Sequence, residues 1–413
     1  MEFLFTVHRS RSYRNVACLP TVLLASAPSP PPITLMTSPV GSVAIPTPQL
    51  DGIVATQSSI CLLSADDNRL AYRGYDVAEL AENGTYEETA YLLLAGKLPA
   101  RGELDRLVLE LRARQKLPCR VQRLLRELTP AADPMALLRT AVSALALEPT
   151  TPATDISIPG PALDLMAQMP ALVAAIHRLG RGEKPLTPRR SLGVAANLLF
   201  LLGGEKPVRE LARSVEVGLS LRADNELNPS TFAARVTAAT KADLHGCITA
   251  ALAALAGPLH GGHALAVYRL LDELASADGV TRVVDARLAT GKPFPGFGHP
   301  VYRGEDPRTA AMRRAAEAAA DAVGDRTWLE LAQAVDARVR SATGTYPNVD
   351  FYLAPLYRAA GIPPELFPAV FAVARVPGWL AHVQEQQSQQ GLIRPRAAYV
   401  GPRRQEYVPL RRR

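Results

Sequence analysis

Apolar residues recur at helical spacing along most of the chain, and this pattern constrains the fold more than any other feature. Thr85 and Glu88 have the spacing of a helix capping box, and apolar residues follow them on one face. A second amphipathic segment covers about residues 103–115, and helical spacing resumes later and holds through Leu255. The chain is therefore predicted to be all-α.

A short exception to the helical pattern lies near the start of the chain. The segment 53–63 alternates in part between apolar and polar residues, and turn-forming residues follow at 66–68. The segment 69–72 would form the second strand, which runs back along the first. This arrangement predicts a short β-hairpin. Because 48% of the 413 residues are apolar, the chain can bury a large core, which we expect to divide into two lobes.

The formal net charge is +7, which suits anionic small substrates or nucleic acid. The basic residues are scattered rather than gathered into one stripe, so a basic enzyme is favoured and nucleic-acid binding is not expected. The longest apolar run, Val194–Leu202, stops at Gly203 and is too short to cross a bilayer, so no membrane partner is expected either. The terminal arginines at 411–413 are interpreted as part of a solvated basic tail.

Four cysteines, Cys18, Cys61, Cys119 and Cys247, lie far apart and form no C-x-x-C pair. This spacing predicts reduced thiols in a cytoplasmic protein, without a disulfide framework or a zinc site. No bound metal is therefore expected.

Residues 1–36 differ in composition from the rest. They contain one acidic residue, Glu2, together with three arginines, a short apolar stretch and the proline-rich run 28–32. A secretory signal or a transit peptide would account for the arginines. We favour a disordered leader, or a start that is really at Met36, because the apolar stretch is short for a signal core.

Three irregular segments between predicted helices each contain a group that can transfer protons. They are 257–263 with His260, 292–307 with His299, and 344–350, which ends in Asp350. Glycines beside the two histidines allow a ligand to approach the backbone closely, and loops between helices often present reactive side chains. Taken alone, each such residue is more often a hydrogen-bonded loop residue than a catalytic group.

Two arginines stand in unusual positions. Asp306-Pro307 predicts a helix start, and Arg308 in its first turn would oppose the helix dipole. This indicates either an anion ligand or an ion pair with Glu305. Arg375 interrupts an apolar run, where a buried guanidinium would need a carboxylate partner.

Eight segments together resemble citrate synthases, and they occur in the order of that family between about residues 50 and 401. Any one segment is a weak signal, whereas all of them in order are highly specific. The segments are Tyr72–Asp76, Ser230–Val236, Gly257–Gly262, Pro295–His299, Asp306–Arg308, Pro347–Tyr352, Phe371–Trp379 and Ile393–Arg396.

The resemblance implies a two-domain helical homodimer, in which a large and a small helical domain close over the substrates. We expect a leader at 1–36, a large domain at 37–258 and 358–402, a small domain at 259–357, and a basic tail at 403–413. No cofactor is expected to be permanently bound, because a coenzyme A thioester serves as co-substrate.

The resemblance also implies residue roles. Asp350 would remove a methyl proton from acetyl-CoA, His260 would stabilise the enolate, and His299 would polarise the ketone of oxaloacetate. A thioester methyl group is a very weak acid, so base and oxyanion donor must act together. The citryl thioester would then be hydrolysed to citrate and coenzyme A.

Other residues would bind the substrates. Arg308, Arg375 and Arg394 would hold carboxylates, Arg394 from the partner subunit, because a planar guanidinium matches a carboxylate. The coenzyme A site would be formed by Pro295, Gly296, Phe297, Gly298 and Arg303.

The chain departs from the family at the oxo-acid pocket. Asn225 stands where a histidine is usual, and Arg222 could lie on the same helical face and supply the missing charge. Other departures are the segment 263–265, Pro300 and Leu353. These changes leave two alternatives open: a 2-methylcitrate synthase that uses propionyl-CoA, or a catalytically silent relative.

Overall fold

The computed structural model describes residues 53–129, 133–150, 152–153, 156–275 and 279–413. The expected leader, with Cys18 and Met36, lies outside the described residues. By backbone contacts the chain divides into a unit formed by residues 54–397 and a second unit that includes residues 398–413. Within the second unit, the described tail is exposed and contains a short 3₁₀-helix, Leu410–Arg412.

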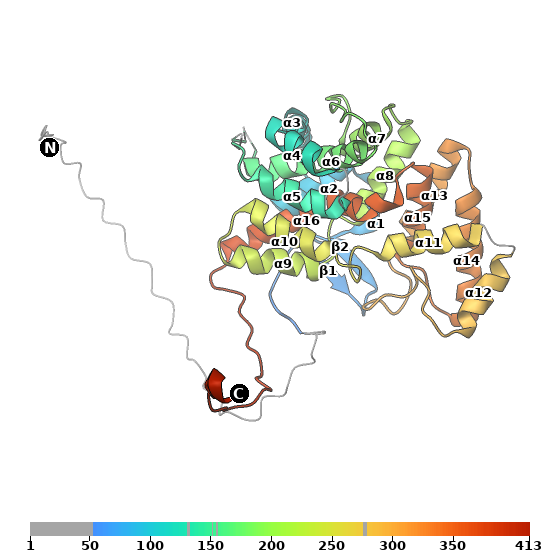
Figure 1. Cartoon of the computed structure of the whole chain (residues 1–413). Helices are drawn as coiled ribbons and strands as arrows, with labels where there is room; N and C mark the ends of the chain where they lie inside the picture. The colour runs from blue at the N-terminus through green and yellow to red at the C-terminus, as the bar shows by residue number, and fades with distance from the viewer. Residues whose placement is uncertain (1–52, 130–132, 151, 154–155, 276–278) are drawn as a thin grey trace, which may run out of the picture. The chain divides into compact units, whose positions relative to one another are not determined.

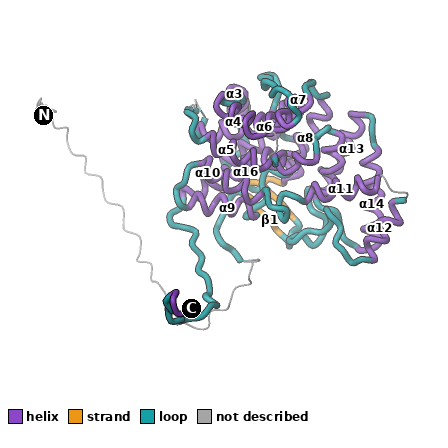
Figure 2. The backbone as a smooth tube through the Cα atoms, in the orientation of Figure 1, coloured by secondary structure: helices purple, strands orange, loops and turns teal. Residues whose placement is uncertain are grey.

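The prediction of an all-α protein is confirmed (Figure 2). The described residues form sixteen α-helices. They are α1 (Val77–Asn83), α2 (Tyr86–Ala95), α3 (Arg101–Arg114), α4 (Cys119–Leu128), α5 (Pro134–Leu145), α6 (Gly160–Gly180), α7 (Val194–Gly203), α8 (Arg209–Leu221), α9 (Pro229–Ala239), α10 (Leu244–Leu255), α11 (His263–Ala275), α12 (Val280–Ala289), α13 (Thr309–Val323), α14 (Thr327–Thr343), α15 (Val349–Ala359) and α16 (Phe367–Ser388).

The predicted hairpin is also present. Strand β1 (Cys61–Ser64) pairs antiparallel with β2 (Arg69–Tyr72), and Cys61 lies opposite Tyr72. A two-residue strand β3 (Tyr75–Asp76), which the sequence pattern did not predict, pairs with β2 and leads into α1. Asn68 has φ 48°, a left-handed conformation that asparagine tolerates well, and it lies in the turn before β2.

Local sequence signals account for several helix starts. Thr85 and Glu88 form the predicted capping box at the start of α2. The side chains of Asp133, Asn228 and Asp243 accept hydrogen bonds from the first turns of α5, α9 and α10. Such a cap typically stabilises a helix by about 1 kcal/mol, so these helix starts are specified locally before any packing.

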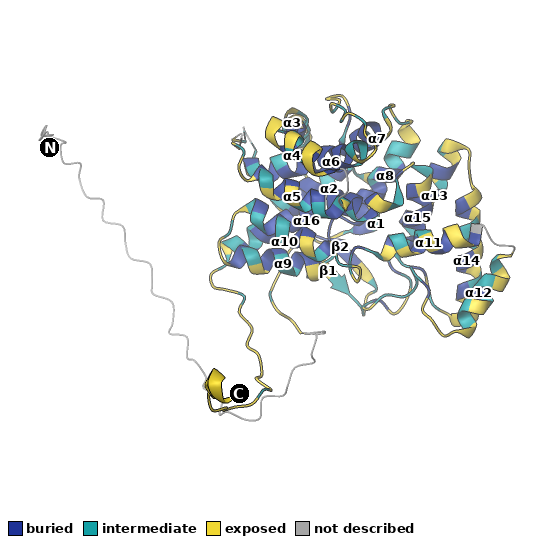
Figure 3. Ribbon diagram, viewed as in Figure 1, coloured by how far each residue is buried: buried dark blue, intermediate teal, exposed yellow. Residues whose placement is uncertain are grey.

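Helix α16 runs through the core and packs against α2, α6, α9 and α10 (Figures 1 and 3). By length and composition alone it could cross a membrane, since Pro364–Ser388 has a window of mean hydropathy 1.4. The prediction that Val194–Leu202 is the longest apolar candidate was therefore wrong. The sequence of α16 does not form an unbroken apolar run, because Arg375 and His382 interrupt it. Within the protein 94% of that window is buried, as expected of a core helix.

Helices α11 to α15 lie together on one side of this unit (Figure 1). Helix α15 packs against α11, α13 and α14, while α13 also packs against α8. Helix α8 in turn contacts α16, so α8 lies where the two groups of helices meet. The division into large and small domains at residues 258 and 357 stays a prediction.

Candidate active site

Backbone hydrogen bonds join two of the predicted catalytic loops. The amide of Gly298 donates to the carbonyl oxygen of Tyr346 at 2.9 Å, and the amide of Asn348 donates to the carbonyl of Gly296 at 2.8 Å. Phe297 and Pro347 form an isolated β-bridge between these two bonds. The pairing holds the loop that carries His299 against the loop that leads to Asp350.

Asn348 fixes both loops with one side chain. Its Oδ1 accepts a hydrogen bond from the amide of Asp350 at 3.0 Å and so caps α15. Its Nδ2 donates to the carbonyl of Gly298 at 2.8 Å. Asp350 is thereby held in the first turn of α15, with its side chain only 16% exposed.

Gly296 shows why this junction needs glycine. Its φ is +78°, in the left-handed region, and a Cβ atom there would lie 2.7 Å from Cγ2 of Val267 and 3.0 Å from Cβ of Phe351. A larger residue would both strain the backbone and push the two loops apart.

His299 is held as a neutral hydrogen-bond donor. Its Nδ1 accepts from the amides of Val301 and Tyr302 at 3.1 and 3.3 Å, so the proton of the neutral ring lies on Nε2. Burial, helped by the positive charge of Arg308, lowers the pKa of His299 to about 4. The ring therefore stays neutral near pH 7 and can donate from Nε2.

His260 lies in a tight turn whose glycines are also required. The amides of His260 and Gly261 both donate to the carbonyl of Gly257. A Cβ atom on Gly261 would collide with the carbonyl oxygen of Leu255. Burial lowers the pKa of His260 to about 4, with smaller contributions from nearby cations, so this ring is also neutral at physiological pH.

Ser230 holds His260 in place, and sequence reasoning did not assign it a role. Its hydroxyl donates to Oδ1 of Asn228 at 2.7 Å, accepts from Nε1 of Trp379 at 3.1 Å, and lies 2.8 Å from Nε2 of His260. A hydroxyl group has one proton, so it can donate to either His260 or Asn228 but not to both. The orientation of Ser230 therefore determines which nitrogen of His260 carries a proton.

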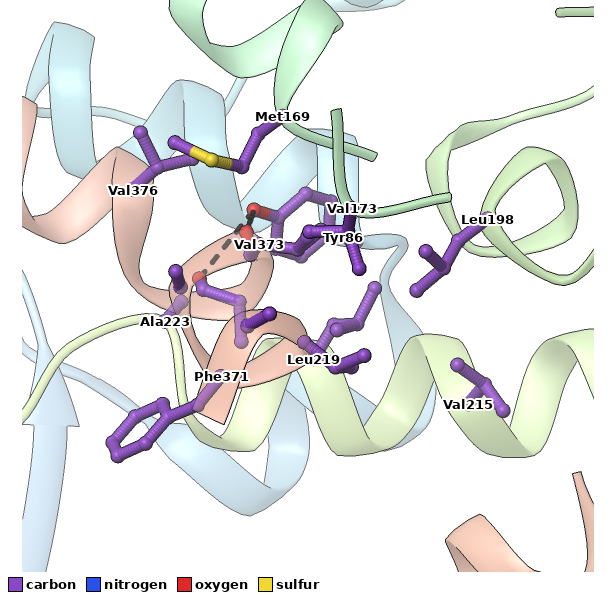
Figure 4. Packing of buried hydrophobic residues seen from close by; sticks show 14 of the residues in the cluster. Tyr86, Met169, Val173, Leu198, Val215, Leu219, Ala223, Phe371, Val373 and Val376 are labelled. Atoms are coloured by element: carbon purple, nitrogen blue, oxygen red, sulfur yellow. Dashed lines mark hydrogen bonds between the residues drawn. The ribbon is translucent and has the colours of Figure 1, made fainter. Parts of the chain in front are cut away.

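Phe371 gathers three predicted site residues around its ring. The His260 ring centroid lies 6.1 Å from that of Phe371 in a T-shaped arrangement. The guanidinium carbons of Arg222 and Arg375 lie 3.6 and 4.8 Å from the Phe371 centroid. Figure 4 shows the Phe371 ring pointing away from the packed side chains of Tyr86, Met169 and Val173, which leaves it free for these contacts.

Arg375 is a buried cation that forms no ion pair with a carboxylate in the part of the chain that the structure describes. Its Nε donates to the carbonyl oxygen of Arg222 at 2.8 Å, and its Nη1 is buried without a hydrogen-bond partner among the described residues. Burial lowers the pKa of Arg375 to about 10, although the charge of Asp224 opposes this. The expected carboxylate partner is therefore replaced by a backbone carbonyl, and Nη1 remains available to an anion.

Arg308 has a partner in the structure, and it is not Glu305. Its Nε and Nη2 donate to the two carboxylate oxygens of Asp306 at 2.9 and 2.8 Å, and Asp306 also accepts from the amide of Val349 at 3.1 Å. The predicted helix start at 306–307 lies slightly early, since α13 begins at Thr309. Oδ1 of Asp306 still accepts from the amide of Arg308 at 3.0 Å, as a helix cap would, while the carboxylate also binds the Arg308 guanidinium. This pair ties the start of α13 to the start of α15.

Arg222 and Asn225 lie beyond the end of α8, so the expectation that they share a helical face was wrong. Arg222 is the C-cap residue, and the Tyr72 hydroxyl donates to the carbonyl of Asp224 at 2.9 Å and accepts from its amide at 3.1 Å. Nη2 of Arg222 lies 3.0 Å from Oδ1 of Asp350. Oδ1 of Asn225 is buried without a hydrogen-bond partner in the described part of the chain.

The structure thus brings His260, Arg222 and Arg375 together around Phe371, places Asp350 beside Arg222, and links Asp350 to His299 through Asn348. Other predicted residues are less constrained. Pro295, Gly296, Phe297 and Gly298 belong to the loop beside His299, whereas Arg303 and Arg394 are exposed. Asn348 and Phe371 belong to segments that resemble the family, but no local pattern indicated what they contact.

Further polar clusters lie away from this arrangement. A cavity of about 400 Å³ is lined by residues of α3, α5, α6 and α10, including Glu110, Asp164 and His245. Neither His260 nor His299 lines this cavity, and Asp350 does not line it either. Within the described residues, no group of three or more His, Cys, Asp or Glu side chains is placed to hold a metal ion.

Known proteins are similar in sequence to this chain over most of its length. A family model described as citrate synthase, C-terminal domain, matches residues 49–396. A protein of Bacillus subtilis (strain 168) named Citrate synthase 2 is 39% identical over 368 residues, which cover 88% of this chain and 98% of that protein. A 2-methylcitrate synthase of Mycobacterium tuberculosis (strain ATCC 25618 / H37Rv) is 36% identical, covering 85% of this chain and 90% of that protein.

Solved structures are similar over the same extent. The citrate synthase from Pyrobaculum aerophilum matches with a TM-score of 0.79 at 34% identity and covers 88% of this chain and 95% of that chain. The enzyme from Thermoplasma acidophilum, solved with carboxymethyl coenzyme A and oxaloacetate, matches with a TM-score of 0.79 at 31% identity, covering 88% and 98%.

Proposed function

The chain belongs to the citrate synthase family, and from this premise we propose that Asp350, His260 and His299 carry out its condensation of acetyl-CoA with oxaloacetate. The chain is an acyltransferase, in which the acyl group becomes an alkyl group on transfer. The observation that supports these roles best is the contact pattern around Asp350, which reaches His299 through Asn348 and the surroundings of His260 through Arg222.

The first step is deprotonation. The Asp350 carboxylate takes a proton from the thioester methyl group, and the electrons of the broken C–H bond move to the thioester oxygen. His260 stabilises that oxygen by donating a hydrogen bond, which requires a proton on Nδ1 because Nε2 faces Ser230. This role requires Ser230 to donate to Nε2 in place of Oδ1 of Asn228, to which its hydroxyl donates in the structure.

The second step forms the carbon–carbon bond. The enolate carbon attacks the ketone carbon of oxaloacetate, and the ketone oxygen becomes an alkoxide. Neutral His299 donates a hydrogen bond from Nε2 to this oxygen as the charge develops, and the alkoxide is protonated by the proton that Asp350 removed and passes on through solvent. Water then cleaves the citryl thioester to release citrate and coenzyme A.

Guanidinium groups bind the carboxylates of oxaloacetate. Arg375 offers a buried Nη1 without a hydrogen-bond partner in the described structure, Arg308 lies near His299, and Arg222 and Asn225 complete the oxo-acid pocket. The loop 295–298 and Arg303 bind coenzyme A. The protein is a cytoplasmic homodimer in which the exposed Arg394 reaches the partner's site, as the family resemblance implies.

A thiol-release assay tests the proposal. Free coenzyme A should be released from acetyl-CoA only when oxaloacetate is present, and citrate should be formed in equal amount. If none of the 2-oxo acids tried causes release of coenzyme A, the assignment as an enzyme is contradicted and a catalytically silent relative is favoured. A higher kcat/KM with propionyl-CoA than with acetyl-CoA would identify a 2-methylcitrate synthase instead.

A further inference from the structure

Arg222 occupies a buried position between the base and the carboxylate-binding residues. It is 4% exposed and follows α8 directly. Its backbone carbonyl accepts from Arg375, its guanidinium lies 3.6 Å from the Phe371 centroid, and its Nη2 lies 3.0 Å from Oδ1 of Asp350. A charge in this position can act on both substrates.

The Arg222–Asp350 pair differs from the other buried pair of the site. Arg308 and Asp306 form two aligned hydrogen bonds, with both carboxylate oxygens used. In contrast, Oδ1 of Asp350 is buried and accepts no aligned hydrogen bond from any described residue, although the guanidinium lies at ion-pair distance. The pair is therefore held by charge rather than by directed hydrogen bonds, and the carboxylate of a bound anion can compete with Asp350 for the guanidinium.

The incoming 2-oxo acid carries such a carboxylate. Nη1 of Arg375 is a buried donor without a described partner, so it is a natural first contact for a dianion. An anion bound there lies next to Arg222, because Arg375 bonds to the carbonyl of Arg222 and both guanidinium groups contact Phe371.

We propose that Arg222 is a substrate-operated latch that holds Asp350 until a carboxylate of the 2-oxo acid takes the guanidinium and frees the base. While the latch is closed, the guanidinium competes with the thioester methyl proton for the electrons of Asp350. Acetyl-CoA that binds first is therefore not deprotonated, which prevents unproductive enolate formation. This inference rests on the proposed function, because it assumes that Asp350 is the base.

Exchange of the methyl hydrogens of acetyl-CoA with deuterium oxide tests the latch, because exchange needs the base but not the ketone. Without any 2-oxo acid, the wild-type protein should exchange slowly, and Arg222→Gln should exchange about tenfold faster, the equivalent of one charge-assisted contact. Arg222→Lys, which keeps the charge, should stay slow, and the exposed Arg120→Gln serves as the matched control. Equal exchange by wild type and Arg222→Gln would overturn the latch.

A second measurement uses the unaltered protein. In a crystal structure with malate, a dicarboxylate that has no ketone to attack, Arg222 should contact a malate carboxylate, and Asp350 should lie beyond ion-pair distance. An unchanged Arg222–Asp350 pair would contradict the latch even if the variants fail to fold. Turnover of oxaloacetate by the wild-type protein, and its loss in Asp350→Asn, would support the proposed function even if the latch is contradicted. The two failures can therefore be told apart.

Discussion

On one side of the candidate site, His299 and Asp350 are held by backbone hydrogen bonds between two loops and by the side chain of Asn348. On the other side, His260, Arg222 and Arg375 are arranged by side chains around Phe371. On the first side the hydrogen bonds between the two loops are made, and its sequence departs from the family at Pro300 and Leu353; Oδ1 of Asp350, which faces Arg222, accepts no hydrogen bond from a described residue. The second side carries the substitutions at 222 and 225 and, within the described structure, buried atoms of Asn225 and Arg375 without hydrogen-bond partners. The difference indicates that the first side is preorganised for proton transfer, whereas the second is completed by the substrate.

The largest expected effect comes from removing the base on the preorganised side. Asp350→Asn should lower kcat by about 10³-fold, within the usual range for losing a general base, while the fold and oxaloacetate binding are retained. Steady-state kinetics and circular dichroism check this, with the exposed Asp325→Asn as control. Undiminished turnover would refute the assignment of Asp350.

The loop junction itself can be broken with one methyl group. Gly296→Ala should lower the free energy of unfolding by about 2–3 kcal/mol, because its Cβ would press on Val267 and Phe351 in addition to the cost of a positive φ. Gly291→Ala is the matched control, since φ is +64° there and the added Cβ would meet nothing within 4 Å, and it should cost about 1 kcal/mol. Urea denaturation measures both. Equal losses would show that the junction tolerates the added volume.

On the side-chain side, Ser230→Ala should lower kcat about tenfold, the value of one hydrogen bond that orients a catalytic group. The KM for oxaloacetate should change little, because Ser230 contacts His260 rather than the oxo-acid pocket. A purely structural role would instead lower stability without a selective loss of kcat. Kinetics and thermal unfolding measured on the same preparation distinguish the two.

A smaller effect is expected where the chain departs from the family. Asn225→His should lower the KM for oxaloacetate about threefold, because it restores a ring N–H donor beside a substrate carboxylate. An unchanged KM would show that Arg222 or another group already supplies that interaction. Asn83→His, on the exposed end of α1, is a suitable control.

The smallest expected effect is an absence of change with pH. His260 and His299 both have a pKa of about 4, so kcat should show no inflection near the ordinary histidine value of about 6.5. The unfolded chain binds these protons between pH 6.5 and 4 while the folded protein does not, so stability is highest above pH 6.5 and falls as the pH is lowered. His299→Gln should reduce that fall in denaturation measurements. A kcat inflection near pH 6.5 that His299→Gln abolishes would contradict the neutral donor.

Much of the fold could be predicted from local sequence. The capping box at Thr85, the hairpin and the helical periodicity each depend on residues close in the chain, and the structure confirms them. The exact start of α13 could not be predicted. Asp306 accepts from the amide of Arg308, as local patterns indicate, but it also binds the Arg308 guanidinium and the amide of Val349, a residue from elsewhere in the chain.

The site residues were identified by motifs, but their contacts were not. The motif that contains Phe371 indicates a substrate arginine, Arg375, without showing that the ring also meets His260 and Arg222. Likewise, Ser230 has an ordinary helix-start sequence, and only the approach of the 257–262 turn from elsewhere in the chain gives it a role. The Arg222–Asp350 contact joins residues 128 positions apart by their numbers, and no local rule specifies it.

A crystal structure with oxaloacetate and carboxymethyl coenzyme A bound tests the central claim most directly. We expect the ketone oxygen to lie within hydrogen-bond distance of Nε2 of His299, the carboxymethyl group beside Asp350, and Nδ1 of His260 facing the position of the thioester oxygen. Ligands bound in the cavity between α3 and α6, or a ketone out of reach of both histidines, would contradict the account.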